Sequence, residues 1–200
     1  MRYIDASSMY AWQFAKALYL ADLHGWTQFV SIQNYYNLLH REEDREMMGL
    51  CAAKGIGVNP SSLLARGRLT RAWQAGNSKR SDNDTVGEAL YWKTEVVDRL
   101  GDFAEKRSIS RATLALAWML SKPVMTSPIV GATKPNYLVD AVAALSVKLT
   151  AEEIALPEQP YTPHSVVGFN ESRIGNFYHP IPISQSLHLW RLRHAEVIRT

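Results

Sequence analysis

One arrangement constrains the fold more than any other feature of the sequence: a strand-like run followed by a helix-like segment occurs four times. The four pairs cover residues 2–25, 29–55, 56–121 and 123–145. Strands that alternate with helices are typical of parallel sheets built from βαβ units. We therefore predict an α/β fold with four such units.

The helical segments carry recognisable ends. The first two, at 11–25 and 41–55, each end at a glycine, and the third unit contains two helices broken near Ser108. A polar insertion at 75–84 precedes that pair. Thr150 and Glu153 have the spacing of a capping box, which predicts a last helix after the fourth unit.

The chain changes character after Phe169. Residues 170–200 contain two prolines and a late basic stretch, and they do not continue the alternation of strands and helices. We predict a domain at 1–169 and a loosely docked tail at 170–200, to which we assign no function. The alternative for 187–198 is a basic amphipathic helix that touches an acidic partner or a membrane surface.

Composition narrows the class of protein. A hydrophobic content of 46%, with six Trp and nine Tyr, is enough to form a core, and a net charge of +3 does not favour a nucleic-acid partner. Cys51 is the single cysteine, which excludes an internal disulfide, and no apolar run is long enough to span a bilayer. We expect a cytoplasmic protein with no nucleic-acid or membrane partner.

Polar residues stand at the ends of all four predicted strands. In parallel α/β folds, ligands bind at the carboxyl ends of the strands, where loops and helix N-termini meet. We therefore expect a ligand site built from these strand ends, which are Ser7 with Ser8, Gln33 with Asn34, Ser61 with Ser62, and the corner Gly131, Ala132, Thr133 and Lys134.

The corner at 131–134 suits an anion such as phosphate, because small residues precede a helix N-terminus and Lys134 adds a positive charge. The alternative is that Gly131 only allows a turn and that Lys134 is a surface lysine. One of Ser7 and Ser8 is expected to cap the first helix. Gln33 ends a predicted buried strand, so its amide needs hydrogen-bond partners from the protein or from a ligand.

Further residues allow two interpretations each. Asp140 can accept a hydrogen bond from an adenine amino group or face solvent, and Arg66 and Arg68 can hold a pyrophosphate or be solvated. His24 and His40 have no second histidine at helical ligand spacing, so we interpret them as surface or capping residues and predict no metal site.

With these strand ends in place, the chain resembles the aldo-keto reductase superfamily, in particular its bacterial branch close to the potassium channel β-subunits. The resemblance extends from Arg2 to about Phe169 and rests on the segments RYIDASSMYAWQ, FVSIQNYYNLLHREEDREM, GVNPSSLLARGRLTR, TLALAWMLSKPVMTSPIVGATK and LSVKLTAEEIALPEQPYTPH. It implies a partial (β/α)8 TIM barrel, made of about four C-terminal βα units, and NADP(H)-dependent reduction of aldehydes or ketones.

The resemblance also implies roles for individual residues. Ser7, Ser8 and Gln33 correspond to residues that hold the nicotinamide carboxamide. The loop with Ser62, Leu64, Arg66 and Gly67 corresponds to the one over the pyrophosphate. The corner Gly131, Ala132, Thr133 and Lys134 resembles the loop at the adenosine phosphate, with Asp140 at the adenine.

The sequence departs from the family in three respects. Asp5 stands where the related branch usually has Gly, and Ser61 to Leu64 replace an aromatic residue followed by Ser-Pro-Leu. No residue matches the Asp, Tyr, Lys and His of the catalytic tetrad, so we expect the chain to be inactive alone. The alternative is a truncated pseudoenzyme that binds at most a nucleotide or a partner chain. Open sheet edges predict self-association.

Overall fold

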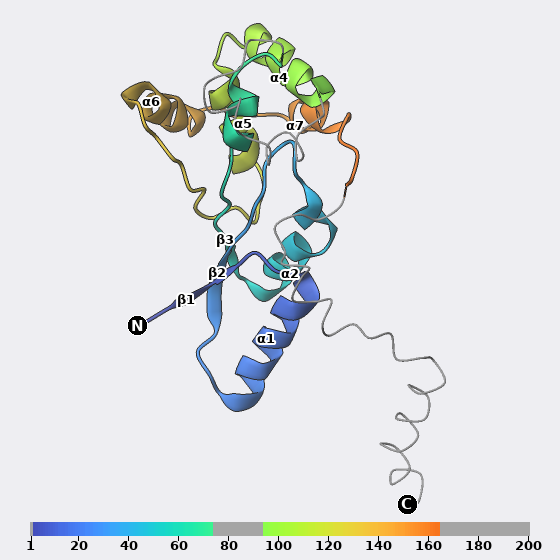
Figure 1. The fold of residues 1–200 in the computed structure, drawn as a ribbon, viewed down its shortest axis with the longest axis vertical. Helices are drawn as coiled ribbons and strands as arrows, with labels where there is room; N and C mark the ends of the chain where they lie inside the picture. The colour runs from blue at the N-terminus through green and yellow to red at the C-terminus, as the bar shows by residue number, and fades with distance from the viewer. Residues whose placement is uncertain (1, 74–93, 165–200) are drawn as a thin grey trace, which may run out of the picture. The chain divides into compact units, whose positions relative to one another are not determined.

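A computed structural model describes residues 2–73 and 94–164 of the chain (Figure 1). Its contacts divide the chain into two units, Met1–Gly168 and Phe169–Thr200, and all described residues belong to the first. The predicted insertion at 75–84 and the predicted tail at 170–200 lie outside the described residues.

Three parallel strands form the sheet, in the order β1-β2-β3. They are β1 (Ile4–Ser7), β2 (Phe29–Gln33) and β3 (Gly57–Val58). Helix α1 (Ala11–His24) connects the first two strands, as predicted. The parallel order confirms an α/β fold consistent with part of a barrel.

The helix predicted at 41–55 is wrong as a single element. The structure has a 3-10 helix, η1 (Glu42–Arg45), followed by α2 (Met47–Lys54), with Glu46 between them at φ −144°. Glu42 and Glu43 are buried in η1, and the Glu42 carboxylate accepts hydrogen bonds from Tyr161 OH and from the His164 amide, far along the chain. Tertiary contacts therefore override the helical spacing of the apolar residues.

The fourth predicted strand is also wrong. Residues 125–129 run beside β3 as an extended segment that makes only one bridge, between Val58 and Met125. The amides of Thr126 and Ile129 donate to the carbonyls of Val58 and Pro60, both at 2.9 Å. The segment therefore takes the place of a fourth strand without completing a ladder.

The remaining helices follow the predicted pattern. Ser108, at φ 52°, breaks the chain between the helices of the third unit, and Thr150 and Glu153 form the predicted capping box. A 3-10 element, η2 (Ala65–Thr70), follows β3. The helices are α4 (Thr94–Lys106), α5 (Arg111–Leu120), α6 (Pro135–Ala144) and α7 (Ala151–Glu158).

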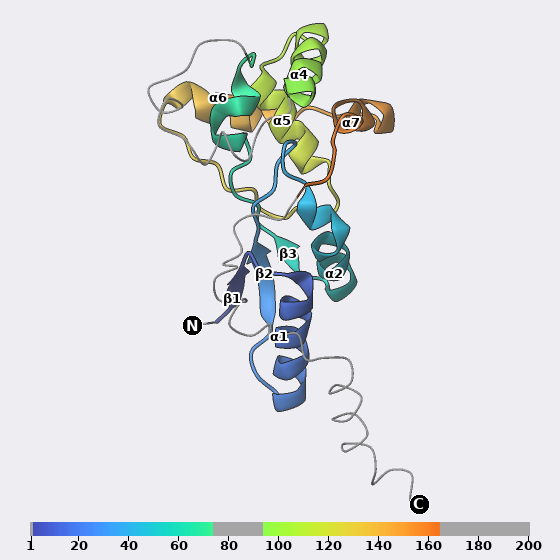
Figure 2. The same ribbon diagram turned by 45° about the vertical axis from the view of Figure 1, so that its right-hand side comes forward.

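The two faces of the sheet differ in character. Figures 1 and 2 show α1 and α2 on the same side, where Ala6, Ile32 and Val58 pack with Phe14 and Leu18. The alternate side chains point the other way and are exposed or half-buried; they include Asp5, Ser7, Ser31 and Gln33. Ser31 Oγ donates to Asp5 Oδ1 at 2.5 Å. The second face is therefore polar.

A larger core lies among η2, α4 and α5. Trp118, Leu100 and Leu69 are at most 1% exposed there, and Tyr36 stacks on the Trp118 ring at 5.6 Å. Because Tyr36 comes from the loop after β2, this core fixes the chain that leaves the carboxyl end of that strand.

Candidate functional site

The structure brings the first three strand ends to one edge of the sheet. Ser7 pairs with Gln33 in the parallel ladder, and Ser8 Oγ donates to the Gln33 carbonyl at 3.2 Å. Ser61 bridges to Tyr35, and its hydroxyl donates to the Asn34 carbonyl at 3.2 Å. Ser7, Ser8, Gln33 and Ser61 therefore form one polar edge.

The loop after β3 continues this edge. Ser62 has a φ of 60°, and its carbonyl accepts a hydrogen bond from Asn37 Nδ2 at 3.1 Å. Leu64 is half-buried at the start of η2, and Arg66 (φ 55°) and Gly67 (φ 93°) make a left-handed turn. Left-handed non-glycine residues cost free energy and concentrate at functional loops. Arg66 is exposed.

The corner at 131–134, predicted as a fourth strand end, lies beyond the extended segment that bonds to β3. Residues 131–134 are all exposed, and Gly131 has open space around the position of a Cβ. Lys134 is the N-cap of α6, and its Nζ lies 5.9 Å from the centre of the Tyr137 ring. Pro135 follows at the first helical position, so α6 begins with N–H groups directed at this corner.

Asp140 lies at the contact between α6 and α5. Its carboxylate accepts a hydrogen bond from Ser110 Oγ at 3.1 Å, and its carbonyl accepts one from Thr113 Oγ1 at 3.2 Å. The side chain therefore already joins two helices, and its contact with an adenine stays a prediction.

Three expectations about polar residues are wrong. Neither Ser7 nor Ser8 caps α1, because the N-cap is Tyr10, whose amide donates to Gln13 Oε1 at 3.1 Å. The Gln33 side chain is exposed, because β2 is covered on one face only. His40 is 1% exposed and contacts a second histidine, so it is not a surface residue. His24, in contrast, is exposed and stacks on Trp26.

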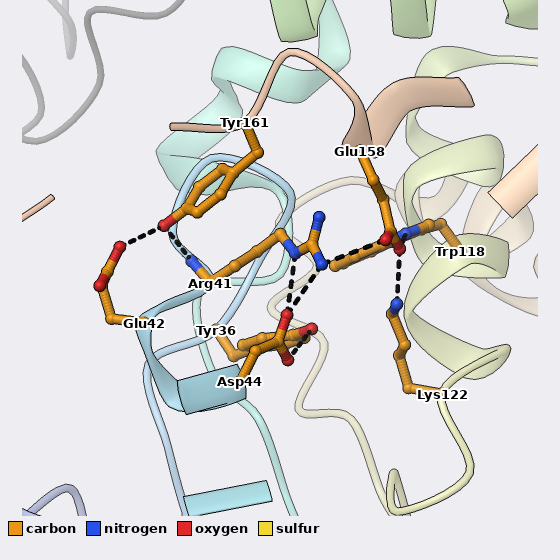
Figure 3. Close-up of polar contacts among 8 residues, drawn as sticks. All are labelled: Tyr36, Arg41, Glu42, Asp44, Trp118, Lys122, Glu158 and Tyr161. Atoms are coloured by element: carbon orange, nitrogen blue, oxygen red, sulfur yellow. Dashed lines mark hydrogen bonds and ion pairs between the residues drawn. The ribbon is translucent and has the colours of Figure 1, made fainter. Parts of the chain in front are cut away.

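A network of charged and aromatic side chains holds the loop that follows β2 (Figure 3). The Arg41 guanidinium pairs with Asp44 at 2.9 Å and with Glu158 at 3.1 Å, while Tyr36 donates to Asp44 at 2.8 Å. Burial, together with the neighbouring Asp44 charge, raises the pKa of Tyr36 far above its ordinary value. The tyrosine therefore stays protonated as a donor.

Glu158 joins this network to α5. Its Oε1 accepts hydrogen bonds from Trp118 Nε1 at 2.6 Å and from Lys122 Nζ at 2.5 Å. Burial alone would raise the pKa of Glu158, but these bonds and the Arg41 charge outweigh it and lower the pKa. No sequence pattern indicated the network, because Arg41 and Glu158 are far apart along the chain.

The groups at the sheet edge fit a nicotinamide nucleotide. A carboxamide needs both donors and acceptors, and the exposed amide of Gln33 and the serine hydroxyls supply both. The exposed Arg66 and Lys134 side chains offer positive charge for phosphates. In residues 2–73 and 94–164, no group of three or more His, Cys, Asp or Glu side chains is arranged to hold a metal ion.

Comparison with known proteins identifies the family: a model of the aldo/keto reductase family matches residues 1–159, and the chain belongs to this family. It is 42% identical to versiconal hemiacetal acetate reductase of Aspergillus parasiticus, over 82% of this chain and 50% of that protein. It is 44% identical to a putative aryl-alcohol dehydrogenase of Schizosaccharomyces pombe, over 84% of this chain and 48% of that protein.

The chain spans about half the length of the curated relatives it matches. Within the part of the chain that the structure describes, no helix has both the length and the apolar character needed to cross a membrane.

Proposed function

We propose that this chain forms the cofactor-binding part of an NADP(H)-dependent aldo-keto reductase that acts on aldehydes or ketones. The observation that supports this most is the polar edge formed by Ser7, Ser8 and Gln33 at the carboxyl ends of neighbouring strands. Relatives named as a reductase and as a putative aryl-alcohol dehydrogenase support a substrate with a carbonyl or alcohol group.

In this proposal, each group has one task. Ser7, Ser8 and Gln33 hold and orient the nicotinamide carboxamide. Arg66, in the loop with Ser62 and Leu64, neutralises the pyrophosphate. Lys134 and the corner Gly131, Ala132 and Thr133 bind the phosphate on the adenosine. When bound, the cofactor supplies the hydride.

Reduction of a carbonyl also needs an acid that donates a proton to the carbonyl oxygen, and none of these residues is assigned that role. No residue of the chain matches the family tetrad, so we propose that the acid comes from another part of the assembled enzyme and that the chain alone is inactive. We further propose that the protein is cytoplasmic and that it belongs to the bacterial branch of the family near the potassium channel β-subunits.

A second candidate is a protein without enzymatic activity that binds a nucleotide or another chain. Asp5 favours it, because a carboxylate on the exposed face of the sheet would be costly to bury inside a closed barrel. In this version the exposed edge of β1 associates with a second copy of the chain.

Titration of the purified chain with NADPH distinguishes the two candidates. Quenching of tryptophan fluorescence measures binding, and size-exclusion chromatography of the same sample shows whether the chain is compact. Saturable binding by a compact species supports the first proposal and makes a complementing half worth seeking. Absence of binding by a folded, compact species contradicts the assignment of the sheet edge as a cofactor site.

Lys134→Ala tests the adenosine-phosphate assignment. We expect the Kd for NADPH to rise about fivefold to tenfold, while the Kd for NADH changes little, because only NADPH carries the extra phosphate. Lys148→Ala is the matched control, since Lys148 is also exposed but lies beyond the other end of α6. Equal losses for both cofactors would remove the assignment.

A further inference from the structure

Four residues that follow α7, 161–164, lie against the loop that follows β2; we call them the strap. Tyr161 OH accepts a hydrogen bond from the Arg41 amide at 2.8 Å. The carbonyl of His164 accepts one from Arg45 at 3.2 Å, and the Arg41 guanidinium lies 5.2 Å from the centre of the Tyr161 ring. The strap and the loop are therefore joined through backbone and side-chain groups.

Glu42 is at the centre of this contact. Its Oε1 accepts hydrogen bonds from Tyr161 OH at 2.6 Å and from the His164 amide at 2.9 Å. Its Oε2 pairs with Arg45 at 2.6 Å, and the side chain is 1% exposed. A buried carboxylate is costly without such partners, so the strap stabilises Glu42 only while it is docked.

Two histidine rings meet beside Glu42. The ring centroids of His40 and His164 are 4.9 Å apart, and those of His40 and Tyr35 are 4.8 Å apart. His164 Nε2 lies 4.0 Å from Glu42 Oε1 and 3.4 Å from the Leu39 carbonyl. His40 Nδ1 has no hydrogen-bond partner among the described residues. The described residues therefore offer no acceptor for a proton on this nitrogen.

We propose that the strap is an acid-released latch: a proton that binds to His40, beside His164, undocks residues 161–164 from the loop after β2. The inference goes beyond the proposed function and does not depend on a bound cofactor. It requires only that His40 is more accessible when the strap is undocked, which its contact with His164 supports.

The sign of the pH dependence follows from the pKa of His40. Burial, and then the His164 charge, lower this pKa from 6.5 to about 4, while Glu42 acts in the opposite direction. The docked state therefore holds fewer protons at His40 than the undocked state. The contribution of His40 to docking is therefore fully present above pH 6.5, and docking weakens as the pH falls toward 4, by up to about tenfold per pH unit for one proton.

The other charged groups of the loop differ from His40 in the pH range or in the sign of their effect. The pKa of Glu42 is lowered, because the bonds from Tyr161 and His164 and the charges of His164 and Arg45 outweigh its burial. Protonation of Glu42 therefore undocks the strap at a lower pH than protonation of His40 does. Burial raises the pKa of Glu43, also in η1, to about 7, so this group titrates in the same range with the opposite sign, because its protonation favours the buried state.

The test is amide hydrogen exchange, followed residue by residue by NMR between pH 4 and 7.5 and corrected for the intrinsic exchange rate. The Arg41 amide donates to Tyr161 and the His164 amide donates to Glu42, so both report on the contact between loop and strap. We expect the protection of these two amides to fall about tenfold per pH unit below about pH 6. The Leu114 amide in α5, bonded to the Ser110 carbonyl, reports on global unfolding and should keep its protection.

Two variants and one control identify the group that titrates. His40→Phe keeps an aromatic ring against Tyr35 and His164, and His40→Gln keeps a polar side chain; either should abolish the pH slope down to about pH 4.5. His24→Gln replaces an exposed histidine and should leave the slope unchanged. A slope that persists in both His40 variants, a flat wild-type profile, or parallel loss of protection at Leu114 would each overturn the proposal.

Discussion

Glu43 carries an unusual protonation equilibrium for a glutamate. It is 6% exposed in η1, and its burial raises its pKa to about 7; Asn34 acts in the opposite direction, and the Asp44 charge adds to the rise. A group whose pKa is raised in the folded state costs stability once the pH exceeds its ordinary value of 4.5. The cost grows until the pH passes 7 and is then constant.

Glu43→Gln removes this cost. Relative to the wild type, the variant should gain unfolding free energy between pH 5 and pH 8, by an amount on the order of 2–3 kcal/mol. Urea denaturation at the two pH values measures the difference. Glu46→Gln, an exposed neighbour, is the control and should show no such gain. A constant difference between Glu43→Gln and wild type at both pH values would contradict the assignment.

At the scale of elements, two glycines stand in opposite situations, one in α2 and one just after its end. Gly49 lies inside the helix, whereas Gly55 follows its end with a φ of +65°. A Cβ at either position meets no atom within 4 Å, so packing does not distinguish them. Only the backbone conformation differs, because L residues with a side chain avoid the left-handed region.

Alanine substitutions at these two glycines compare the effect of a side chain inside a helix with its effect at the helix end. Gly49→Ala should raise the unfolding free energy by about 0.5–1 kcal/mol, and Gly55→Ala should lower it by about 1 kcal/mol. Thermal or urea denaturation of the two single variants checks both signs in one experiment. Two changes of the same sign would show that the end of α2 does not depend on the conformation of Gly55.

At the scale of the whole described unit, the sheet ends at β1, which pairs only with β2 within residues 2–73 and 94–164. An unpaired strand edge offers N–H and C=O groups to another chain. Tyr3, beside this edge, is 70% exposed, while the exposed face of the sheet carries the polar side chains of Asp5, Ser7, Ser31 and Gln33. The unpaired side of β1 is therefore a better place for self-association than the polar face of the sheet.

Tyr3→Lys should weaken that association by about tenfold, equivalent to 1.4 kcal/mol, because an edge lysine disfavours strand pairing. Sedimentation velocity over a range of protein concentrations measures the effect. Tyr19→Lys, which changes an equally exposed tyrosine on α1, should leave the association constant unchanged. A wild type that stays a folded monomer at all concentrations would remove self-association from the proposal.

Much of this architecture could be predicted from local signals. Gly25 and Gly55 end helices, Ser108 breaks one, and Thr150 with Glu153 caps another, since each acts within a few residues. The split between η1 and α2 and the loss of a fourth strand depend on distant partners. Proximity of Ser8 to Gln33 follows from parallel pairing alone, but contact between Glu42 and His164 has no local signal.

The strap has a consequence for the order of events during synthesis. Arg41 and Tyr161 are separated by 120 residues, so at 5–20 residues per second the ribosome adds the second of them about 6–24 s after the first. Small domains commonly fold in about a second or less. Residues 39–45 of a nascent chain therefore lack their partners for several seconds, and Glu42 becomes buried only after the strap has been synthesised, which leaves time for chaperones to bind the loop.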